Sequence, residues 1–306
     1  MANSSAYALE GPKWPTPTVT WSFAAGDQFS NAIGTAYQGT IEQALARWAS
    51  VSGVNFVQVA DSSDPSQAPD IRIGFSTLNP GPTSEIGDTT FSYTVGAGGS
   101  QSFLPSVVVS LEDPAQDPLL PDSGGGFTYQ GYATTLYQTA LHEIGHALGL
   151  AHSTDPNAVM FPTLGPSNSD LDATDIAGAQ ALYGAPAPAP DTLVVTMAED
   201  AWQGDAQFIA TLDGNVIGGP QAVTASHSAG DAQNFTFQGN FGPGPHELAI
   251  SFINDAWGGT SSTDRNLYVN GLTYDGANVP ASSASLWTNS TAYFQIPVTA
   301  HAGTAV

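Results

Sequence analysis

The sequence predicts an α+β domain, with a twisted mixed sheet and long helices, followed by an all-β sandwich domain. Two observations lead to this fold class. In residues 1–184 the spacing of apolar residues switches between the strand period and the helical period. After residue 191, short alternating apolar runs separated by Gly, Pro, Asn and Asp dominate, which is typical of antiparallel sheets. A chain of 306 residues is long enough for two such domains.

The boundary is marked by residues 185–191, which read A-P-A-P-A-P-D. Alternating Ala and Pro favours a stiff, extended linker that cannot enter a helix or the interior of a sheet. We therefore expect one domain at 1–184 and another at 192–306, joined by a linker at 185–191.

Apolar patterning in the first domain predicts strands at 19–23, 55–60, 71–75 and 107–111 and helices at 37–50 and 173–183. The clearest element lies between them. Thr135 and Gln138 form a capping box ahead of L-Y-Q-T-A-L-H-E-I-G-H-A-L, and Gly149 supplies a stop. These signals predict a helix at 136–148.

Residues 142–152 read H-E-I-G-H-A-L-G-L-A-H. Helical positions four apart share a face, so His142 and His146 can present their rings to one point. Gly149 is free to adopt a left-handed conformation, which lets the chain turn so that His152 completes a shell of three nitrogens. Zinc bound in this way keeps a fourth position for water.

Glu143 follows the first of these histidines but points away from the metal-binding direction. Its carboxylate can therefore accept a proton from a zinc-bound water and deliver it to a departing amine. The alternative is a helix whose histidines only fill the core. The opposite helix face argues against it, because that face already supplies the apolar residues Tyr137, Leu141, Ile144 and Leu148.

The motif resembles that of the metzincin metalloproteases of the matrixin type, over roughly residues 10–184. The similarity continues through residues 152–162, H-S-T-D-P-N-A-V-M-F-P. The resemblance implies that Met160 is the Met-turn residue, an apolar floor beneath the metal. Phe161 and Pro162 follow it, so the zinc-contacting tyrosine of astacin and serralysin turns is missing.

The chain also departs from animal matrixins. The first domain has no further histidines, so the usual second, structural zinc site cannot be assembled, and without cysteine there is no cysteine switch. The Gly-, Pro- and Asp-rich region 80–131 is either a solvated loop or a calcium site. Its candidate calcium ligands are Glu112, Asp113, Asp117 and Asp122.

The second domain contains two similar phrases, E-D-A-W-Q-G-D at 199–205 and N-D-A-W-G-G-T at 254–260, and then D-R-N-L-Y-V at 264–269. Clustered Asp and Asn in Gly-containing loops suit calcium, which takes six to eight oxygens. Trp202 and Trp257 could stack on a sugar ring or fill the sandwich core.

These phrases resemble the calcium-dependent carbohydrate-binding modules of the xylan-binding type, in which loop calcium coordinates sugar hydroxyls. The resemblance implies calcium ligands at Asn254, Asp255 and Asp264. A second set, which could be structural, comprises Glu199, Asp200 and Asp205. The remaining histidines show no spacing that suggests a site: His227, His246 and His301.

The net charge of the chain limits the kinds of molecule that it is expected to bind. With 27 acidic and 4 basic residues the net charge is -23, which repels nucleic acid and anionic lipid and suits divalent cations. Acidity that serves only solubility is an equally good explanation. No apolar run is long enough for a transmembrane helix. Residues 1–9 lack a signal peptide's features, so we expect that a signal was removed or that another export route is used.

Together these patterns predict a secreted, monomeric zinc endopeptidase that acts on protein or peptide and carries a calcium-dependent module for xylan-like polysaccharide. Ser-, Thr-, Asn- and Gly-rich composition with few lysines favours the extracellular location. The main alternative is a calcium-dependent carbohydrate-binding protein with an inactive metzincin domain. A third possibility is a calcium-stabilised sandwich without sugar affinity.

Overall fold

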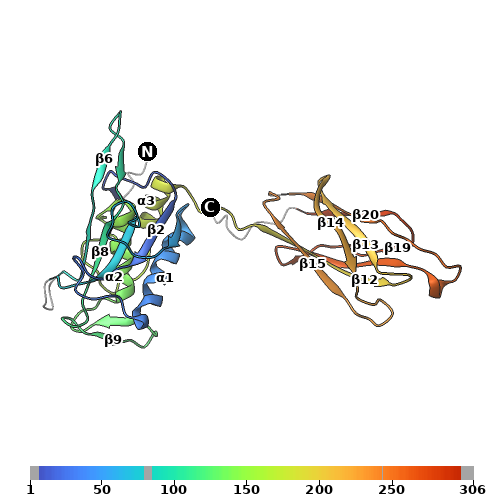
Figure 1. The fold of residues 1–306 in the computed structure, drawn as a ribbon, viewed down its shortest axis with the longest axis horizontal. Coiled ribbons are helices and arrows are strands. Elements are labelled where there is room, and N and C mark those ends of the chain that lie inside the picture. Colours follow the sequence, from blue (N-terminus) through green and yellow to red (C-terminus); the bar gives the residue numbers. More distant parts are fainter. Residues whose placement is uncertain (1–6, 79–84, 243, 298–306) are drawn as a thin grey trace. The chain divides into compact units, whose positions relative to one another are not determined.

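The computed structural model describes residues 7–78, 85–242 and 244–297. His301 and the first six residues, on which two of the expectations above rest, lie outside this part. The chain divides into two compact units between Ala187 and Pro188, within the Ala-Pro stretch. Figure 1 shows both units, which are described separately below.

The first unit is built on a mixed five-stranded sheet with the strand order β3-β2-β4-β8-β5. The strands are β2 Thr18–Phe23, β3 Asn55–Gln58, β4 Ile71–Ser76, β5 Gly87–Thr90 and β8 Val107–Glu112. Four strands run parallel, while β5 pairs antiparallel with β8 and forms the edge. All six residues of the central strand β4 are buried, as expected when both faces of a strand are covered. The predicted mixed sheet is confirmed.

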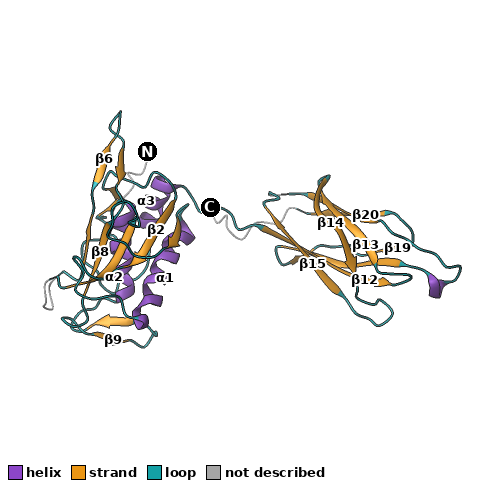
Figure 2. Ribbon diagram, viewed as in Figure 1, coloured by secondary structure: helices purple, strands orange, loops and turns teal. Residues whose placement is uncertain are grey.

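The unit contains three helices: α1 Thr35–Val51, α2 Leu136–Leu148 and α3 Ala173–Tyr183 (Figure 2). α1 and α2 pack on the sheet, and α3 packs on α1. The predicted bounds of α2 and α3 are confirmed, and the predicted 37–50 helix extends by two residues at its start and one at its end. The buried Trp48 of α1 donates from Nε1 to the carbonyl of Leu141 at 3.0 Å. This bond satisfies the indole where α1 and α2 pack together.

One predicted strand is too long. We expected a strand at 55–60, but β3 ends at Gln58. Its partner β2 offers one more acceptor, Trp21, to the amide of Val59. The chain then turns so that Asp61 reaches the guanidinium of Arg72 on β4, with Nε to Oδ1 at 2.8 Å. The strand is therefore shorter than periodicity alone predicts, and an ion pair holds the segment that follows it.

Short strand pairs complete the first unit and were not predicted. They are β1 Ala8–Leu9 with β11 Leu150–Ala151, β6 Tyr93–Val95 with β7 Gln101–Phe103, and β9 Leu119–Pro121 with β10 Phe127–Tyr129. The first pair holds the segment that enters the domain against the segment that leaves α2. It therefore fixes the chain near the three histidines.

The second unit consists of two antiparallel sheets. One sheet contains β12 Asp191–Asp200, β15 Gln233–Gly239, β17 Asn266–Tyr274, β18 Ala277–Asn278 and β19 Ala284–Leu286. The other contains β13 Ala206–Leu212, β14 Asn215–Val223, β16 His246–Phe252 and β20 Thr291–Ile296. A short 3₁₀ helix spans Ser261–Thr263. Inward residues of both sheets, among them Val195 and Ile250, form one buried core, so the predicted all-β sandwich is confirmed.

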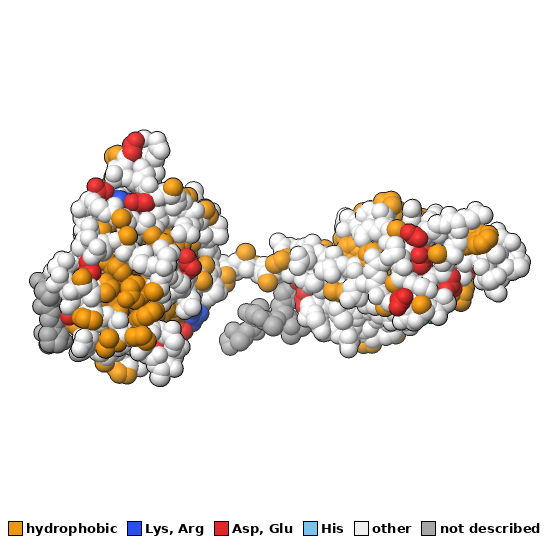
Figure 3. Space-filling view, turned by 60° about the horizontal axis from the view of Figure 1, so that its bottom comes forward, with side chains coloured by type: hydrophobic (Ala, Val, Ile, Leu, Met, Phe, Trp, Pro, Cys, Tyr) orange, Lys and Arg blue, Asp and Glu red, His pale blue; other side chains and the backbone are white. Residues whose placement is uncertain are grey.

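Charge is distributed as the composition suggests. On the face shown in Figure 3, acidic side chains are spread over both units and basic ones are few. Among the described residues, no helix combines the length and apolarity that crossing a bilayer requires.

Candidate metal centre and active site

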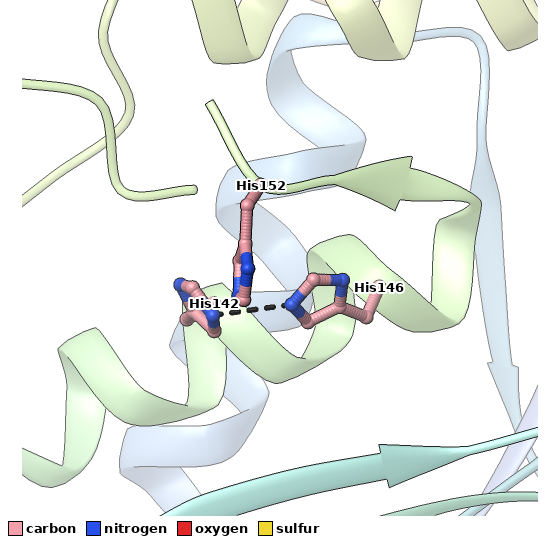
Figure 4. A group of neighbouring side chains, drawn as sticks. All are labelled: His142, His146 and His152. Carbon is pink, nitrogen blue, oxygen red and sulfur yellow. Dashed lines mark hydrogen bonds between the residues drawn. The ribbon is translucent and has the colours of Figure 1, made fainter. Parts of the chain in front are cut away.

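The three histidines of the motif meet at the end of α2 (Figure 4). His142 and His146 lie one turn apart, and their Nε2 atoms are 3.1 Å from each other. Gly149 ends the helix in a left-handed conformation with φ 102°, and a Cβ there would lie 2.3 Å from the carbonyl oxygen of Pro12. The chain then passes through β11 and returns His152. One nitrogen of each ring lies within 4.8 Å of the others.

Backbone carbonyls orient two of the rings. Nδ1 of His142 lies 2.7 Å from the carbonyl of Val159, and Nδ1 of His146 lies 2.8 Å from that of Leu150. Each Nδ1 must carry a proton to donate in these bonds, so each Nε2 presents a lone pair to the common centre. Two lone pairs at 3.1 Å repel each other unless a cation or proton lies between them. The arrangement therefore fits a bound metal ion.

Burial keeps these rings neutral. It lowers the pKa of His142 to about 4. Burial, together with the neighbouring histidines, lowers the pKa of His146 to about 3. Neutral imidazole is the form that binds metal, and a set of three nitrogens with room for water suits catalytic zinc. Within the described residues this is the only cluster of three or more His, Cys, Asp or Glu side chains close enough to share an ion.

Glu143 points from α2 towards the edge strand β5. It is 5% exposed, and its Oε2 accepts a hydrogen bond from the hydroxyl of Thr89 at 2.7 Å. Burial raises the pKa of Glu143 to about 8; the Thr89 hydrogen bond opposes this rise, and the charges of Asp88 and Glu85 add to it. The carboxyl group therefore holds a proton more readily than an exposed one would.

Met160, the predicted Met-turn residue, is buried against α2, the helix that carries His142 and His146. It is 2% exposed, and its Sδ would be 2.3 Å from a Cβ placed on Gly145 of α2. The turn is closed by the amide of Ser153, which donates to the carbonyl of Met160 at 2.7 Å. Gly145 in the helix thus lets the thioether approach the backbone of α2 next to His146.

Asp175 is a site residue that sequence reasoning missed. Its carboxylate accepts hydrogen bonds from the amides of Val159 at 2.7 Å and Met160 at 3.1 Å. It is buried on α3, where it is also the reciprocal partner of Asp172 in the helix's capping box. Only the capping-box spacing was readable in the sequence, and that signal indicates a helix start rather than a link to the metal site.

The metal centre opens into a cleft of about 760 Å³. β5 lines one side and residues 162–164 line another. Besides Glu143, three acidic residues, Glu10, Glu85 and Asp88, contribute to its wall, and no Lys or Arg is among the described residues that line it. Glu10 also places Oε1 3.5 Å from Nδ1 of His146. A substrate therefore enters a negatively charged cleft.

The calcium candidates of the first unit do not gather. Asp113 accepts from Ser30, Asn31 and the amide of Ala115. Asp122 accepts from the amides of Gly124 and Gly126. Glu112 accepts from the amide of Leu78, and Asp117 from the hydroxyl of Tyr132. Protein donors meet each of these carboxylates, but Glu112 and Asp113 are buried, so neither a solvated loop nor a shared calcium site describes these two residues.

The two predicted calcium sets of the second unit lie in neighbouring loops. Asn254 donates from Nδ2 to the carbonyl of Asp205 at 2.9 Å, which joins the sets. A buried arginine, Arg265, lies between the loops and donates to the carbonyls of Gly204, Asn254 and Trp202. Sequence reasoning gave Arg265 no role, although it lies inside the quoted D-R-N-L phrase.

Among these candidates, only Asp255 has a buried oxygen, Oδ1, without a hydrogen-bond partner. Asp264 is held beside Trp257 by a β-bridge. Glu199 accepts from the amide of Ala206, and Asp200 from the hydroxyl of Tyr268 at 2.7 Å. No three of the carboxylates described in this unit lie close enough to share an ion by themselves.

The two tryptophans differ in exposure. Trp257 is 61% exposed, so it does not fill the sandwich core, whereas Trp202 is half-buried. His246 binds Asp213 through Nδ1 at 2.7 Å, and His227 stacks on Tyr268 with ring centroids 3.7 Å apart. Both histidines therefore have partners within the second unit.

The mixed sheet, the three converging histidines and the buried glutamate define a metallopeptidase-type catalytic domain. The chain belongs to the matrixin family, because residues 13–184, more than half of its length, match the family model described as Matrixin. Residues 192–289 match a second model, described as Ca-dependent carbohydrate-binding module xylan-binding.

Known relatives agree with the first match. Metalloendoproteinase 1-MMP of Arabidopsis thaliana is 30% identical over 210 residues, which are 68% of this chain and 54% of that protein. Matrix metalloproteinase-25 of Homo sapiens is 31% identical over 188 residues, 58% of this chain and 31% of that protein. The chain thus spans about half the length of the plant relative and about a third of the human one. A solved structure, vCBM60 in complex with galactobiose, is 17% identical with a TM-score of 0.26, covering 34% of this chain and 97% of that one.

Proposed function

We propose that this chain is a secreted zinc-dependent endopeptidase that hydrolyses peptide bonds with Glu143 as the general base. The observation that carries the proposal is the convergence of three imidazoles on one point beside a buried carboxyl group, at the floor of a cleft. His142, His146 and His152 would hold zinc. The metal would supply an acidified water and a polarised scissile carbonyl.

Glu143 would handle the protons. A base for this reaction must accept a proton and then give it to the departing amine, which favours a pKa near the working pH. Burial moves the pKa of Glu143 in that direction, to about 8. The hydrogen bond from Thr89 to Oε2 keeps one carboxylate oxygen engaged, and no described donor engages Oε1. Oε1 is therefore the oxygen that we assign to the reacting proton.

The substrate would bind in an extended conformation. β5 is an edge strand on the side of the cleft, and an edge strand offers backbone groups to which a peptide can pair. The acidic side chains in the cleft wall and the net charge of -23 favour peptides with cationic side chains. We therefore propose extended, basic peptide segments as preferred substrates.

The second unit would hold the enzyme on polysaccharide. We propose Asn254, Asp255 and Asp264 as calcium ligands, supported by the unpartnered Oδ1 of Asp255 and by the calcium-dependent family match. Trp257 is exposed beside Asp264, where its ring could stack on a sugar. Glu199, Asp200 and Asp205 remain a second proposed set, and the hydrogen bonds of Glu199 and Asp200 favour a structural role for it.

The alternative is a carbohydrate-binding protein whose protease-like domain is inactive. Casein digestion separates the two proposals. We expect digestion by the zinc-loaded chain and none by Glu143→Ala or after chelation. Glu42→Ala is the matched control, since Glu42 lies exposed on α1, away from the cleft, and should leave digestion unchanged. Equal digestion by Glu143→Ala and wild type would refute the mechanism.

Bound-metal analysis tests the ligand assignment directly. We expect one zinc per wild-type chain and a large loss of zinc in His152→Ala.

Retention on insoluble xylan tests the second unit: calcium should be required, and Trp257→Ala should weaken retention. Tyr293→Ala is the control, because Tyr293 is equally exposed, at 64%, but lies on β20. Retention that needs neither calcium nor Trp257 would contradict the sugar-binding proposal.

A further inference from the structure

The edge strand β5 places a residue with a hydroxyl group, Thr89, and a residue without a side chain, Gly87, beside the Glu143 carboxylate. Side chains two apart on a strand point to the same face, so Gly87 and Thr89 both face α2. Thr89 contacts one carboxylate oxygen of Glu143, and Gly87 lies against the other. Sequence reasoning assigned no role to either residue.

The single hydroxyl hydrogen of Thr89 is shared between two acceptors of Glu143. Its Oγ1 lies 2.7 Å from Oε2 and 3.0 Å from the backbone carbonyl oxygen of Glu143. A hydroxyl group at both distances can occupy only a narrow range of positions, and Thr is stiff at χ1. In the ionised form, in which Glu143 acts as the base, the hydrogen bond to Oε2 is to a charged oxygen and is the stronger kind. Thr89 therefore restricts the glutamate side chain to one orientation relative to its own helix.

Gly87 leaves the space that this orientation needs. A Cβ at residue 87 would lie 2.4 Å from Oε1 and 2.7 Å from Cγ of Glu143, closer than real contacts allow. The backbone of Gly87 does not need a left-handed conformation, since it is absent from the residues with positive φ. Its requirement is for space beside the carboxylate. Any side chain at residue 87 would push the carboxylate away from its position.

We infer that Gly87 and Thr89 form a cradle that positions the Glu143 carboxylate, with Oε2 held by the Thr89 hydroxyl and Oε1 left free for the reacting proton. Both are positioning residues, because they act through Glu143. The inference rests on the proposed function, since it assumes that Glu143 is the base. A base held in advance needs no reorganisation when substrate arrives, and small misplacements of catalytic groups reduce rates strongly.

The test compares Thr89→Val, which keeps the shape of the side chain and removes the hydroxyl, with Thr89→Ser, which restores a hydroxyl. For a fluorogenic peptide we expect kcat to fall about tenfold or more in Thr89→Val, the size expected for a lost hydrogen bond to a charged group. KM should change little, and Thr89→Ser should recover most of kcat. Thr94→Val is the control, because Thr94 is exposed on β6, outside the strand proposed to bind the peptide, and does not line the cleft.

A second variant and a second measurement guard against misfolding. Gly87→Ala should lose more activity than Thr89→Val while still binding one zinc per chain. In a crystal structure of the metal-free Thr89→Val chain, the Glu143 carboxylate should occupy more than one position. A kcat within twofold of wild type for Thr89→Val, a change confined to KM, or a single unchanged carboxylate position would overturn the inference. If Glu143→Ala digests casein like wild type, it is the proposed function that fails, and the crystal structure still tests the cradle.

Discussion

Asp175 connects the closing helix of the catalytic domain to the metal site, and replacing it by Asn tests that connection. One carboxylate oxygen accepts from Val159 at 2.7 Å and Asp172 at 3.0 Å, and the other accepts from Met160 at 3.1 Å. Asn has a single acceptor oxygen. With that oxygen kept towards Val159, its NH₂ group faces the amide of Met160, and both are donors.

The expected loss follows from these three bonds. One buried amide becomes unsatisfied, which costs about 1–3 kcal/mol, and two bonds to a charged acceptor become bonds to a neutral one. We therefore expect Asp175→Asn to lower the free energy of unfolding by about 3 kcal/mol. For a domain of this size that is a fall in Tm of about 6–12 °C. Since Val159 in turn accepts from Nδ1 of His142, zinc affinity should also fall, by about tenfold.

Calorimetry and zinc titration of the full chain measure both effects, and Asp172→Asn supplies the control. Asp172 caps the same helix through one oxygen, which accepts from the amides of Thr174 and Asp175. Asn is as good a helix cap as Asp, so this variant should change stability by only a few tenths of a kcal/mol. Equal effects of the two substitutions would refute the reasoning, because they would show that Asp175 matters only as part of the helix start.

Three further predictions concern charge, pH and metal. Peptides with Lys near the cleavage site should have a kcat/KM about fivefold or more above that of matched Glu peptides. Added salt, or the double variant Glu85→Gln, Asp88→Asn, should reduce this ratio. A preference for Glu peptides would contradict the charge argument. Burial alone would lower the pKa of His246, but the hydrogen bonds with Asp213 and Gly242 outweigh burial and raise the pKa. The stability that these hydrogen bonds give to the folded chain is complete below the unfolded pKa of 6.5. It is lost as the pH rises through the raised folded pKa. Hydrogen-exchange protection factors of residues 246–252, which correct for the intrinsic rise of exchange with pH, should therefore fall above that range in wild type and in His227→Gln but not in His246→Gln. Identical profiles of protection against pH in all three chains would exclude the His246–Asp213 pair as the cause. Removing zinc should lower the Tm of the first unit, since an ion at 100 times its Kd stabilises the folded state by about 2.7 kcal/mol, and a Tm insensitive to chelation would argue against a bound ion.

The sequence predicted the parts of the site that lie on one continuous segment. The Thr135 capping box, the spacing of His142 and His146 and the stop at Gly149 are local signals, and each depends on short-range geometry that a helix imposes. Tertiary structure was needed for partners far apart in the chain. Thr89 and Glu143 are 54 residues apart, and neither the edge position of β5 nor the direction of its side chains can be read from the sequence D-T-T.

In the second unit, too, the sequence alone did not show how the acidic side chains are used. Its acidic loops looked like two calcium sites because Asp, Asn and Gly cluster in sequence, yet a carboxylate in a loop has two uses, cation binding and hydrogen bonding to nearby donors. Glu199 and Asp200 have the second use, with the amide of Ala206 and the hydroxyl of Tyr268, whereas Oδ1 of Asp255 is buried with no donor. A buried carboxylate oxygen without a partner is unfavourable unless a cation meets it. Asp255 is therefore the residue at which the two uses can be told apart, and its loop is where calcium dependence should arise if the module binds sugar.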